Sequence, residues 1–296
     1  MNVVILDDFF RFRKMFTLIT HTDLDGLGSV VLCNYYRIPL KDYILWDYSQ
    51  IDINSLTKLK DIIITDLSIM ESDYIKLKDK NVHIYDHHES SKYLSKYGQI
   101  CDIKRCGTKI FFNEFIKKHE KYKENKDVER FVNLVDTYDR WLDDNPLWED
   151  ALQLNRLCIS LPHKEFISLA PSIINRHFEY DSYEREIISK LENEENKLFE
   201  DAKKELKLFK DERNNTYGVF PCFKSQSLIC NMILKTVEDM KYVIGYFPNG
   251  KISVRSKKCF DLTQLSKING HKNAMGGFLN KKELNGLLQG IPIPYN

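Results

Sequence analysis

The sequence predicts a two-domain α/β protein whose N-terminal domain is built on a parallel β-sheet. In the first half, short apolar runs rich in β-branched residues alternate with longer amphipathic stretches, which is typical of strands joined by helices. After residue 214 the composition changes again, which indicates a second, smaller α/β domain. The length of 296 residues, with 43% hydrophobic and 29% charged residues, suits a globular protein of this size.

The expected elements of the first domain, residues 1–180, follow one another in a regular order. Each strand is a run of four to six mostly apolar residues, and the last 70 residues of the domain have a helical pattern. The expected strands are Phe16–Thr20, Asp42–Trp46, Asp61–Thr65 and Val82–Tyr85, and the expected helical stretches are Gly28–Tyr36 and Lys109–Phe178.

A connecting helix and a C-terminal domain are expected to complete the chain. Residues 181–213 interleave Lys and Glu around a narrow apolar stripe, which predicts a long exposed helix between the domains. Residues 214–296 then form the second domain, with strands expected at Tyr217–Phe220, Tyr242–Phe247 and Lys251–Arg255. The sequence Pro248-Asn249-Gly250 predicts a hairpin turn between the last two.

Charge and cysteine content exclude some classes of protein. A net charge of +1 argues against a bulk electrostatic grip on long nucleic acid, although a cleft can still have a local basic lining. The seven cysteines form no CxxC pair, which favours reduced thiols in a cytosol over a disulfide framework. No apolar run is long enough to span a membrane and no secretory signal is present, so we expect a soluble cytoplasmic protein. The oligomeric state stays open, a homodimer included.

Acidic and histidine residues follow three of the predicted strands. Because ligands bind outside the carboxyl ends of strands in open α/β sheets, we expect these side chains to converge on one rim of the sheet. A single aspartate there is usually a helix cap and a His-His pair is usually structural, but capping alone does not explain three such clusters. The residues are His21, Asp23 and Asp25 after the first strand, Asp66 after the third, and Asp86, His87 and His88 after the fourth.

The residue types in these clusters predict a site for two divalent metal ions. Asp23 and Asp25, two residues apart, can offer oxygens to neighbouring ions, Asp66 can bridge them, and His87 adds an imidazole. Carboxylate oxygen and imidazole nitrogen together suit Mn²⁺, and Mg²⁺ or Zn²⁺ less strongly. Two such ions would bind phosphate oxygens and activate a bridging water, which predicts a phosphoesterase.

The chain resembles the DHH phosphoesterases, named for the tripeptide that stands here at Asp86-His87-His88. The family's first motif, His-x-Asp-x-Asp-Gly-x-x-Ser, is complete from His21 to Ser29. The resemblance implies that His87 binds metal and that His88 contacts the substrate phosphate or donates a proton. It also implies that Asp86 orients an imidazole.

The family requires a further aspartate from a later helical region, and two candidates are present. Asp136 and Asp139 lie three apart on one helical face. The Tyr-Asp-x-Trp context resembles the nanoRNase branch and favours Asp139, with Asp136 as a cap or a partner of Arg140. His21, two residues before Asp23, is an additional metal-ligand candidate, although some branches of the family place a metal-binding histidine four residues before this aspartate, where this chain has Ile19. Gly107 and Thr108, in a loop that also resembles the family, are expected to cap the helix that begins near Lys109.

The C-terminal region resembles the DHH-associated domain, which implies that it binds the substrate phosphate. Arg255 ends a predicted strand and Ser256 follows it, and Gly270 and His271 precede an Asn-Ala sequence typical of that domain. Glycine lets backbone amides approach an anion, and arginine offers a fork of donors matched to phosphate. The family's glycine run and its Ala-Gly pair are replaced here by Ile268-Asn269-Gly270 and Met275-Gly276. Without the resemblance, Gly276-Gly277 would be a turn.

The resemblance covers residues 17–278 and points to the nanoRNase and RecJ-type exonuclease branches. It implies manganese-dependent degradation of short RNA or single-stranded DNA oligonucleotides to 5′-mononucleotides. The alternatives are a phosphatase or phosphodiesterase for small nucleotides, such as 3′-phosphoadenosine-5′-phosphate or a cyclic or linear dinucleotide, and a non-catalytic nucleotide-binding module. Tyr138, Trp141 and Trp148 are either core residues or rings on which a base stacks.

Overall fold

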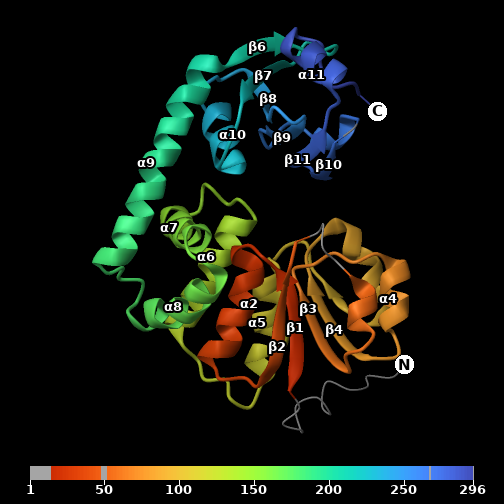
Figure 1. Cartoon of the computed structure of the whole chain (residues 1–296), viewed down its shortest axis with the longest axis vertical. Coiled ribbons are helices and arrows are strands. Elements are labelled where there is room, and N and C mark those ends of the chain that lie inside the picture. The colour runs from red at the N-terminus through yellow and green to blue at the C-terminus, as the bar shows by residue number, and fades with distance from the viewer. Residues whose placement is uncertain (1–14, 48–51, 267, 296) are drawn as a thin grey trace. The chain divides into compact units, whose positions relative to one another are not determined.

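The structure is a computed structural model of the chain, and it describes residues 15–47, 52–266 and 268–295. It divides into two compact parts, the N-terminal unit (residues 1–189) and the C-terminal unit (residues 190–296), each with its own sheet (Figure 1). No helix within the described ranges is long and apolar enough to cross a membrane.

The N-terminal unit is built on a five-stranded parallel sheet, which confirms the predicted fold class. Its strand order is β2-β1-β3-β4-β5, so that β1 lies between two neighbours that follow it in the chain. The register sets Ile19 opposite both Ile44 and Ile64. The strands are β1 (Phe16–His21), β2 (Leu40–Trp46), β3 (Asp61–Thr65), β4 (Asn81–Asp86) and the two-residue β5 (Ile100–Cys101).

Both faces of this sheet are covered by helices, which explains why its strands are continuous apolar runs. Along β1, Leu18 packs into the core beneath α2 and α5, whereas Ile19 packs into the core on the opposite face, which includes residues of α3 and α4 (Figure 1). Ile63 and Ile64 of β3 divide between the two cores in the same way. The helices are α2 (Leu24–Tyr35), α3 (Ile53–Leu56), α4 (Glu71–Leu77), α5 (Gly107–Glu114), α6 (Lys126–Asp139), α7 (Trp148–Ser160) and α8 (His163–Asn175), with 3₁₀ turns η2 (Glu89–Tyr97) and η3 (Ile116–Lys118).

The predicted connecting helix ends at an earlier residue than expected. Helix α9 runs over Ser182–Glu205 rather than to residue 213, and a strand, β6 (Lys207–Lys210), follows it at once. Ile188 packs into the core of the N-terminal unit, and Ala202 packs into a core of the C-terminal unit. The boundary between the two units therefore lies within α9 rather than at its ends.

The C-terminal unit contains a mixed six-stranded sheet in the order β10-β11-β9-β8-β7-β6. The predicted hairpin is present, because β8 and β9 pair antiparallel. Gly276-Gly277 lies in strand β11 and not in a turn, because it pairs with Ile252 and Ser253 of β9. The further elements are β7 (Thr216–Pro221), α10 (Gln226–Leu234), β8 (Met240–Tyr246), β9 (Lys251–Ser256), η4 (Leu262–Gln264), β10 (Asn269–His271), β11 (Ala274–Phe278) and α11 (Lys281–Leu288).

Candidate metal centre

The loop after β1 carries His21, Asp23 and Asp25 and turns directly into α2. Asp23 is the N-cap of this helix, and its side chain accepts a hydrogen bond from the backbone N–H of Gly26 at 3.0 Å. Gly26 lies so close to the end of β1 that a Cβ atom there would be 2.2 Å from the carbonyl oxygen of His21, so only glycine fits. His21 Nδ1 lies 2.8 Å from Asp23 Oδ2. The tight turn thus holds these two side chains together at the carboxyl end of the strand.

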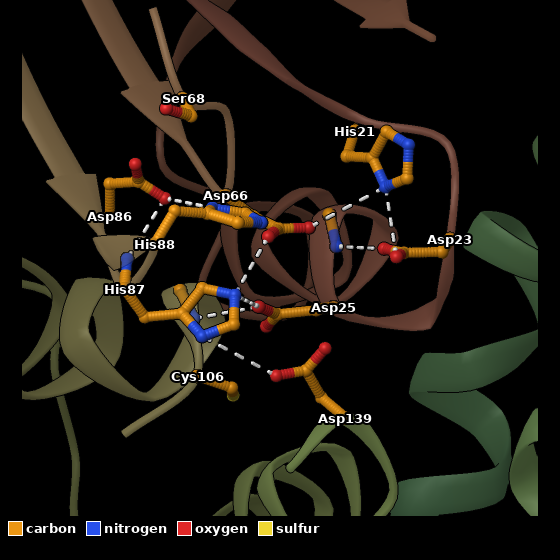
Figure 2. A network of polar contacts seen from close by, with 12 residues as sticks. His21, Asp23, Asp25, Asp66, Ser68, Asp86, His87, His88, Cys106 and Asp139 are labelled. Carbon is orange, nitrogen blue, oxygen red and sulfur yellow. Dashed lines mark hydrogen bonds and ion pairs between the residues drawn. The ribbon is translucent and has the colours of Figure 1, made fainter. Parts of the chain in front are cut away.

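Asp66 occupies the centre of the site (Figure 2). It follows β3 with a positive φ of 52°, a left-handed conformation that is uncommon for residues other than glycine. Its Oδ1 atom lies 3.2 Å from His87 Nε2, and its Oδ2 atom lies 3.9 Å from His21 Nδ1. One carboxylate therefore faces histidines from two different strand ends.

Asp25 lies in the first turn of α2 and caps a different helix, α5. Its Oδ2 accepts a hydrogen bond from Gly107 N at 2.6 Å, and its Oδ1 accepts one from Thr108 N at 2.7 Å. We expected Gly107 and Thr108 to cap this helix. Instead, their backbone amides donate to the carboxylate of Asp25, and Cys106 at the N-cap position makes no side-chain capping bond. The amides and dipole of the helix N-terminus stabilise the negative charge of Asp25 within the site.

His87 brings the late aspartate into the site. Its Nδ1 atom lies 3.7 Å from Oδ2 of Asp139, the last residue of α6, and its Nε2 atom lies 3.8 Å from Oδ2 of Asp25. The imidazole thus lies among three carboxylates, those of Asp25, Asp66 and Asp139 (Figure 2).

Asp136, the other candidate, makes different contacts. Its Oδ1 accepts a hydrogen bond from Cys106 N at 2.8 Å, and its Oδ2 accepts one from Lys109 Nζ at 2.7 Å. Arg140 Nη1 lies 3.5 Å from the same Oδ2. Asp136 therefore fixes Cys106 at the start of α5. The backbone amides of the next two residues, Gly107 and Thr108, donate to the carboxylate of Asp25. The structure brings Asp139, and not Asp136, next to His87.

Asp86 and His88 form a hydrogen-bonded pair beside this cluster. The Asp86 side chain is fully buried, and its Oδ1 accepts bonds from His87 N at 2.9 Å and from His88 Nδ1 at 2.7 Å. Although burial opposes its charge, the hydrogen bond and the nearby charge of His88 lower the pKa of Asp86. An ionised Asp86 fixes the imidazole of His88 with a proton on Nδ1, so Nε2 is the nitrogen that can exchange a proton.

The side chains fall into sets that match ligand sets for two cations. In each set, one potential ligand atom per residue lies within 4.8 Å of the others. Asp66 has its second oxygen beside the second set, so it can join the two. The sets are His21, Asp23 and Asp66, and Asp25, His87 and Asp139; a further set, Asp66, Asp86, His87 and His88, overlaps them.

Buried carboxylate oxygens that accept no hydrogen bond suit the binding of cations. Oδ2 of Asp66, of Asp86 and of Asp139 are each buried without a hydrogen-bond donor in the part of the chain that the structure describes. Such oxygens destabilise a folded protein unless a cation or a proton compensates them. Carboxylate and imidazole ligands of this kind suit Mn²⁺.

The aspartates also raise one another's pKa values. Burial, followed by the negative charges of Asp25 and Asp23, raises the pKa of Asp66 well above its usual range. Burial and the charge of Asp25 raise the pKa of Asp139 in the same way. These carboxylates repel one another when ionised, and a divalent cation would remove that repulsion.

The two histidines respond to this negative charge. Desolvation acts against their charged forms, yet Asp23 raises the pKa of His21, and Asp139 and Asp25 raise the pKa of His87. The pKa of Asp23 shifts in the opposite direction. Despite desolvation, its hydrogen bond with His21 and the charge of that residue lower the pKa of Asp23 to about 2. In the absence of a cation, protons on the histidines partly neutralise the acids.

Comparison with solved structures identifies the fold. No family model matches the sequence, and no curated protein does. The chain is similar to the DHH domain of a member of a family of ribosomal proteins, with 12% identity over 94% of this chain and 86% of that one and a TM-score of 0.65. It is similar to the pGpG-specific phosphodiesterase PggH from Vibrio cholerae (13% identity, 93% and 96% covered, TM-score 0.60) and to the exonuclease RecJ bound to manganese (11% identity, 98% and 94% covered, TM-score 0.54).

The chain has the DHH-domain fold. In this fold the tripeptide Asp86-His87-His88 spans the end of β4 and the residues after it, and the family's first motif lies at the end of β1, two strands away in the sheet. Two residues near the site were given no role from the sequence. Cys106 lies fully buried beside Asp25, and Ser68, after β3, forms hydrogen bonds with Ser90 at 2.6 Å and Ser91 at 3.0 Å.

The predicted phosphate-binding residues of the C-terminal unit lie on two strands of its sheet, β9 and β10, which are separated by β11. Arg255 on β9 donates through Nη1 to Val254 O at 2.9 Å and to Ser253 Oγ at 3.2 Å, and through Nη2 to Ser227 Oγ at 2.5 Å. Ser256 is buried, and its hydroxyl donates to the carbonyl oxygen of Phe260.

The remaining two predicted residues lie on β10. Gly270 has a φ of 141°, and a Cβ atom there would lie 2.5 Å from Ala274 O, so the position requires glycine. The side chain of His271 lies outside the described part of the structure. The phosphate-binding roles of Arg255, Ser256, Gly270 and His271 stay predictions.

Proposed function

We propose that this chain is a DHH-family phosphoesterase that uses two divalent cations to cut short oligonucleotides into 5′-mononucleotides. The observation that carries this proposal is the position of Asp66, which has one oxygen beside each of two ligand sets. A shared carboxylate of this kind favours a pair of ions over a single one. The fold shared with a phosphodiesterase and an exonuclease supports the same class of reaction.

In this proposal His21, Asp23 and Asp66 hold one ion, while Asp25, His87 and Asp139 hold the other, with Asp66 common to both. Mn²⁺ is the proposed ion because the ligands are carboxylates and imidazoles and because the similar RecJ structure contains manganese. Two bound ions would supply a water of lowered pKa and would neutralise charge on the phosphate.

His88 is the proposed proton donor to the leaving oxygen. Because Asp86 accepts from Nδ1 at 2.7 Å, the proton must be transferred from Nε2. Asp86 also holds the imidazole in one orientation through this hydrogen bond. Hydrolysis then leaves the phosphate on the 5′-oxygen and the new proton on the 3′-oxygen.

The size of the substrate follows from the charge of the chain. A net charge of +1 offers no long basic track, so a few phosphate contacts must suffice. Arg255, with Ser256, Gly270 and His271, is proposed to bind such a phosphate in the C-terminal unit. Short RNA or single-stranded DNA fits this requirement.

A second candidate substrate is a small nucleotide. The similarity to a pGpG-specific phosphodiesterase, over 93% of this chain, favours a dinucleotide in particular. 3′-phosphoadenosine-5′-phosphate and cyclic dinucleotides belong to the same test.

One assay separates these substrates. Purified protein with Mn²⁺ is incubated with 5′-labelled RNA and DNA of two to ten nucleotides, with pGpG, with a cyclic dinucleotide and with 3′-phosphoadenosine-5′-phosphate. The expected result is the release of 5′-mononucleotides from the shortest oligonucleotides at the highest rate. A protein that leaves every compound intact is not a phosphoesterase for nucleotides, and the non-catalytic alternative would then hold.

A matched pair of variants tests the ligand assignment. Asp139→Asn removes a proposed ligand, whereas Glu129→Gln changes an exposed acid on the same helix that pairs with Lys117. Mn²⁺ binding, followed by electron paramagnetic resonance, should weaken strongly in the first variant and stay unchanged in the second. Equal binding by both variants would remove Asp139 from the site.

A further inference from the structure

Three aromatic side chains gather where α6 ends and α7 begins. Tyr138 and Trp148 are stacked, with their ring centroids 6.0 Å apart and their planes at 13°. Trp141 meets the Trp148 ring edge-on at 4.9 Å. Tyr138 directly precedes Asp139, so this cluster adjoins a proposed metal ligand along the chain. We refer to Tyr138, Trp141 and Trp148 as the aromatic cluster.

The backbone of Trp141 is unusual for its residue type. Helix α6 ends in a Schellman motif, in which Leu142 N donates to Thr137 O at 2.9 Å and Trp141 N donates to Tyr138 O at 3.0 Å. Trp141 takes the left-handed position of this motif, with a φ of 52°. Glycine normally occupies that position, because a bulky side chain there is strained. A tryptophan at this position therefore lowers the stability of the fold.

The indole of Trp141 has a second unfavourable feature. Its Nε1 atom is buried without a hydrogen-bond acceptor among the residues that the structure describes. A buried donor without an acceptor destabilises the folded state. Strain and an unpaired donor at one residue point to a requirement other than stability.

An aromatic group of the core in the same unit shows the difference. Phe111 and Phe115 are stacked at 5.0 Å, are almost completely buried and have ordinary backbone angles. All three members of the aromatic cluster, in contrast, keep part of their surface in contact with solvent. Part of the surface of the aromatic cluster, whose Tyr138 precedes Asp139 in the chain, is therefore exposed and available to a ligand.

We propose that the aromatic cluster is a nucleobase-binding subsite, on which a base of the substrate stacks while its phosphate lies at the metal centre. This inference rests on the proposed function. Stacking suits such a role because every base offers a π-face, so binding does not require a particular sequence. Stacking would add a preference for ligands that carry a base to the binding energy from the phosphate contacts.

The test compares two ligands that differ only in the base. Binding of adenosine 5′-monophosphate and of ribose 5-phosphate to the full chain with Mn²⁺ is measured by calorimetry. The expected result is that the nucleotide binds at least about tenfold more tightly, since each stacked base contributes appreciably. Trp148→Leu and Trp141→Leu should each reduce nucleotide affinity about tenfold and leave ribose 5-phosphate affinity unchanged, while Trp148→Phe should retain most of the affinity.

Phe115→Leu is the matched control, because it removes a stacked ring from the core of the same unit. It should lower the unfolding temperature and leave the ratio of the two affinities unchanged. Equal affinity of the wild-type protein for both ligands would overturn the subsite, while hydrolysis of oligonucleotides would still support the phosphoesterase. If the Trp→Leu variants keep the wild-type ratio, the subsite is likewise rejected. Failure to bind either ligand, together with no hydrolysis, would overturn both proposals.

Discussion

Two buried acidic groups, one in each unit, differ in how their charges are compensated. In the C-terminal unit, Asp211 accepts hydrogen bonds from Asn215 N at 2.8 Å, from Arg213 N at 2.9 Å and from the hydroxyl of Tyr295. Although burial acts in the opposite direction, these bonds lower its pKa. In the N-terminal unit, Asp66 and Asp139 each have a buried oxygen without a donor among the described residues, and their pKa values are raised.

The comparison distinguishes an aspartate that stabilises the fold from aspartates that lower its stability. Asp211 ties the turn after β6 to the C-terminal segment through Tyr295, so its charge contributes to stability. The aspartates of the metal centre destabilise the cation-free protein, because the two histidines compensate only part of their mutual repulsion. Substitutions in the two groups should therefore have opposite effects on stability and activity.

The largest effect is expected for Asp66→Asn. Loss of the shared ligand should reduce hydrolysis by about 10³-fold, since a metal ion contributes several kcal/mol to transition-state stabilisation. The unfolding temperature of the metal-free variant should equal or exceed that of the metal-free wild type, because a repelling charge is removed. Rates with labelled oligonucleotides and thermal unfolding in a chelator measure the two quantities. A variant that is inactive because it is unfolded would contradict the comparison.

Asp211→Ala should have the reverse effect. It leaves Tyr295 and Asn215 without their acceptor, and we expect a loss of about 2–3 kcal/mol in the free energy of unfolding. Urea denaturation measures this loss. The turnover number of the folded fraction should stay unchanged, and a selective loss of turnover would give Asp211 a functional role.

Asp136→Asn sharpens the comparison within the N-terminal unit. The amide oxygen can still accept from Cys106 N, but the ion pair with Lys109 is lost. Because this pair fixes the start of α5, and α5 holds Asp25, we expect Mn²⁺ affinity to fall about tenfold. Asp139→Asn, which removes a direct ligand, should reduce affinity more. The opposite ranking in a calorimetric titration would exchange the roles of the two aspartates.

The smallest effect is a pH dependence of the metal-free protein. Groups with raised pKa values contribute stability that is present at low pH and is lost as pH rises through their folded pKa. In the metal centre these groups are Asp25, Asp66, Asp139, His21 and His87. Asp23, whose pKa is about 2, loses its contribution only in strong acid and is constant from about pH 5 to pH 8. The metal-free protein should therefore unfold at a lower temperature at pH 8 than at pH 5.

Added Mn²⁺ should reverse that trend, because its ligands bind in their deprotonated forms. The stabilisation by Mn²⁺ should be greater at pH 8 than at pH 5, as followed by differential scanning fluorimetry. In Asp66→Asn both the pH dependence and the stabilisation should shrink. A metal-free protein that is equally stable at both pH values would show that the acids are compensated in another way.

Much of the N-terminal sheet could be predicted because its strands are buried on both faces. Asp61–Thr65 is a run rich in β-branched residues, and β3 has the predicted bounds. The short strands could not be predicted. β5 has two residues, β10 has three polar or small ones, and β11 contains Gly276-Gly277, which favours a turn on local grounds.

The grouping of acids at the strand ends followed from the sequence, but the details of the site did not. The rule that ligands bind at the carboxyl ends of parallel strands is enough to place Asp23, Asp66 and His87 near one another. The cap of α5 by Asp25 joins residues 82 positions apart, and no local pattern encodes it. The left-handed backbone of Asp66 is equally invisible in the sequence, because it depends on the surrounding structure.

Helix α9 contributes residues to the cores of both units. Ile188 in its first half completes the core of the N-terminal unit, and Ala202 in its second half completes a core of the C-terminal unit. A protease that cuts at the boundary after Ser189 would leave each fragment with only part of this helix. The new helix end in each fragment would lack a capping residue, and each fragment would expose apolar surface. We therefore expect a chain cut after Ser189 to be less stable than the intact chain, even though each unit has its own sheet.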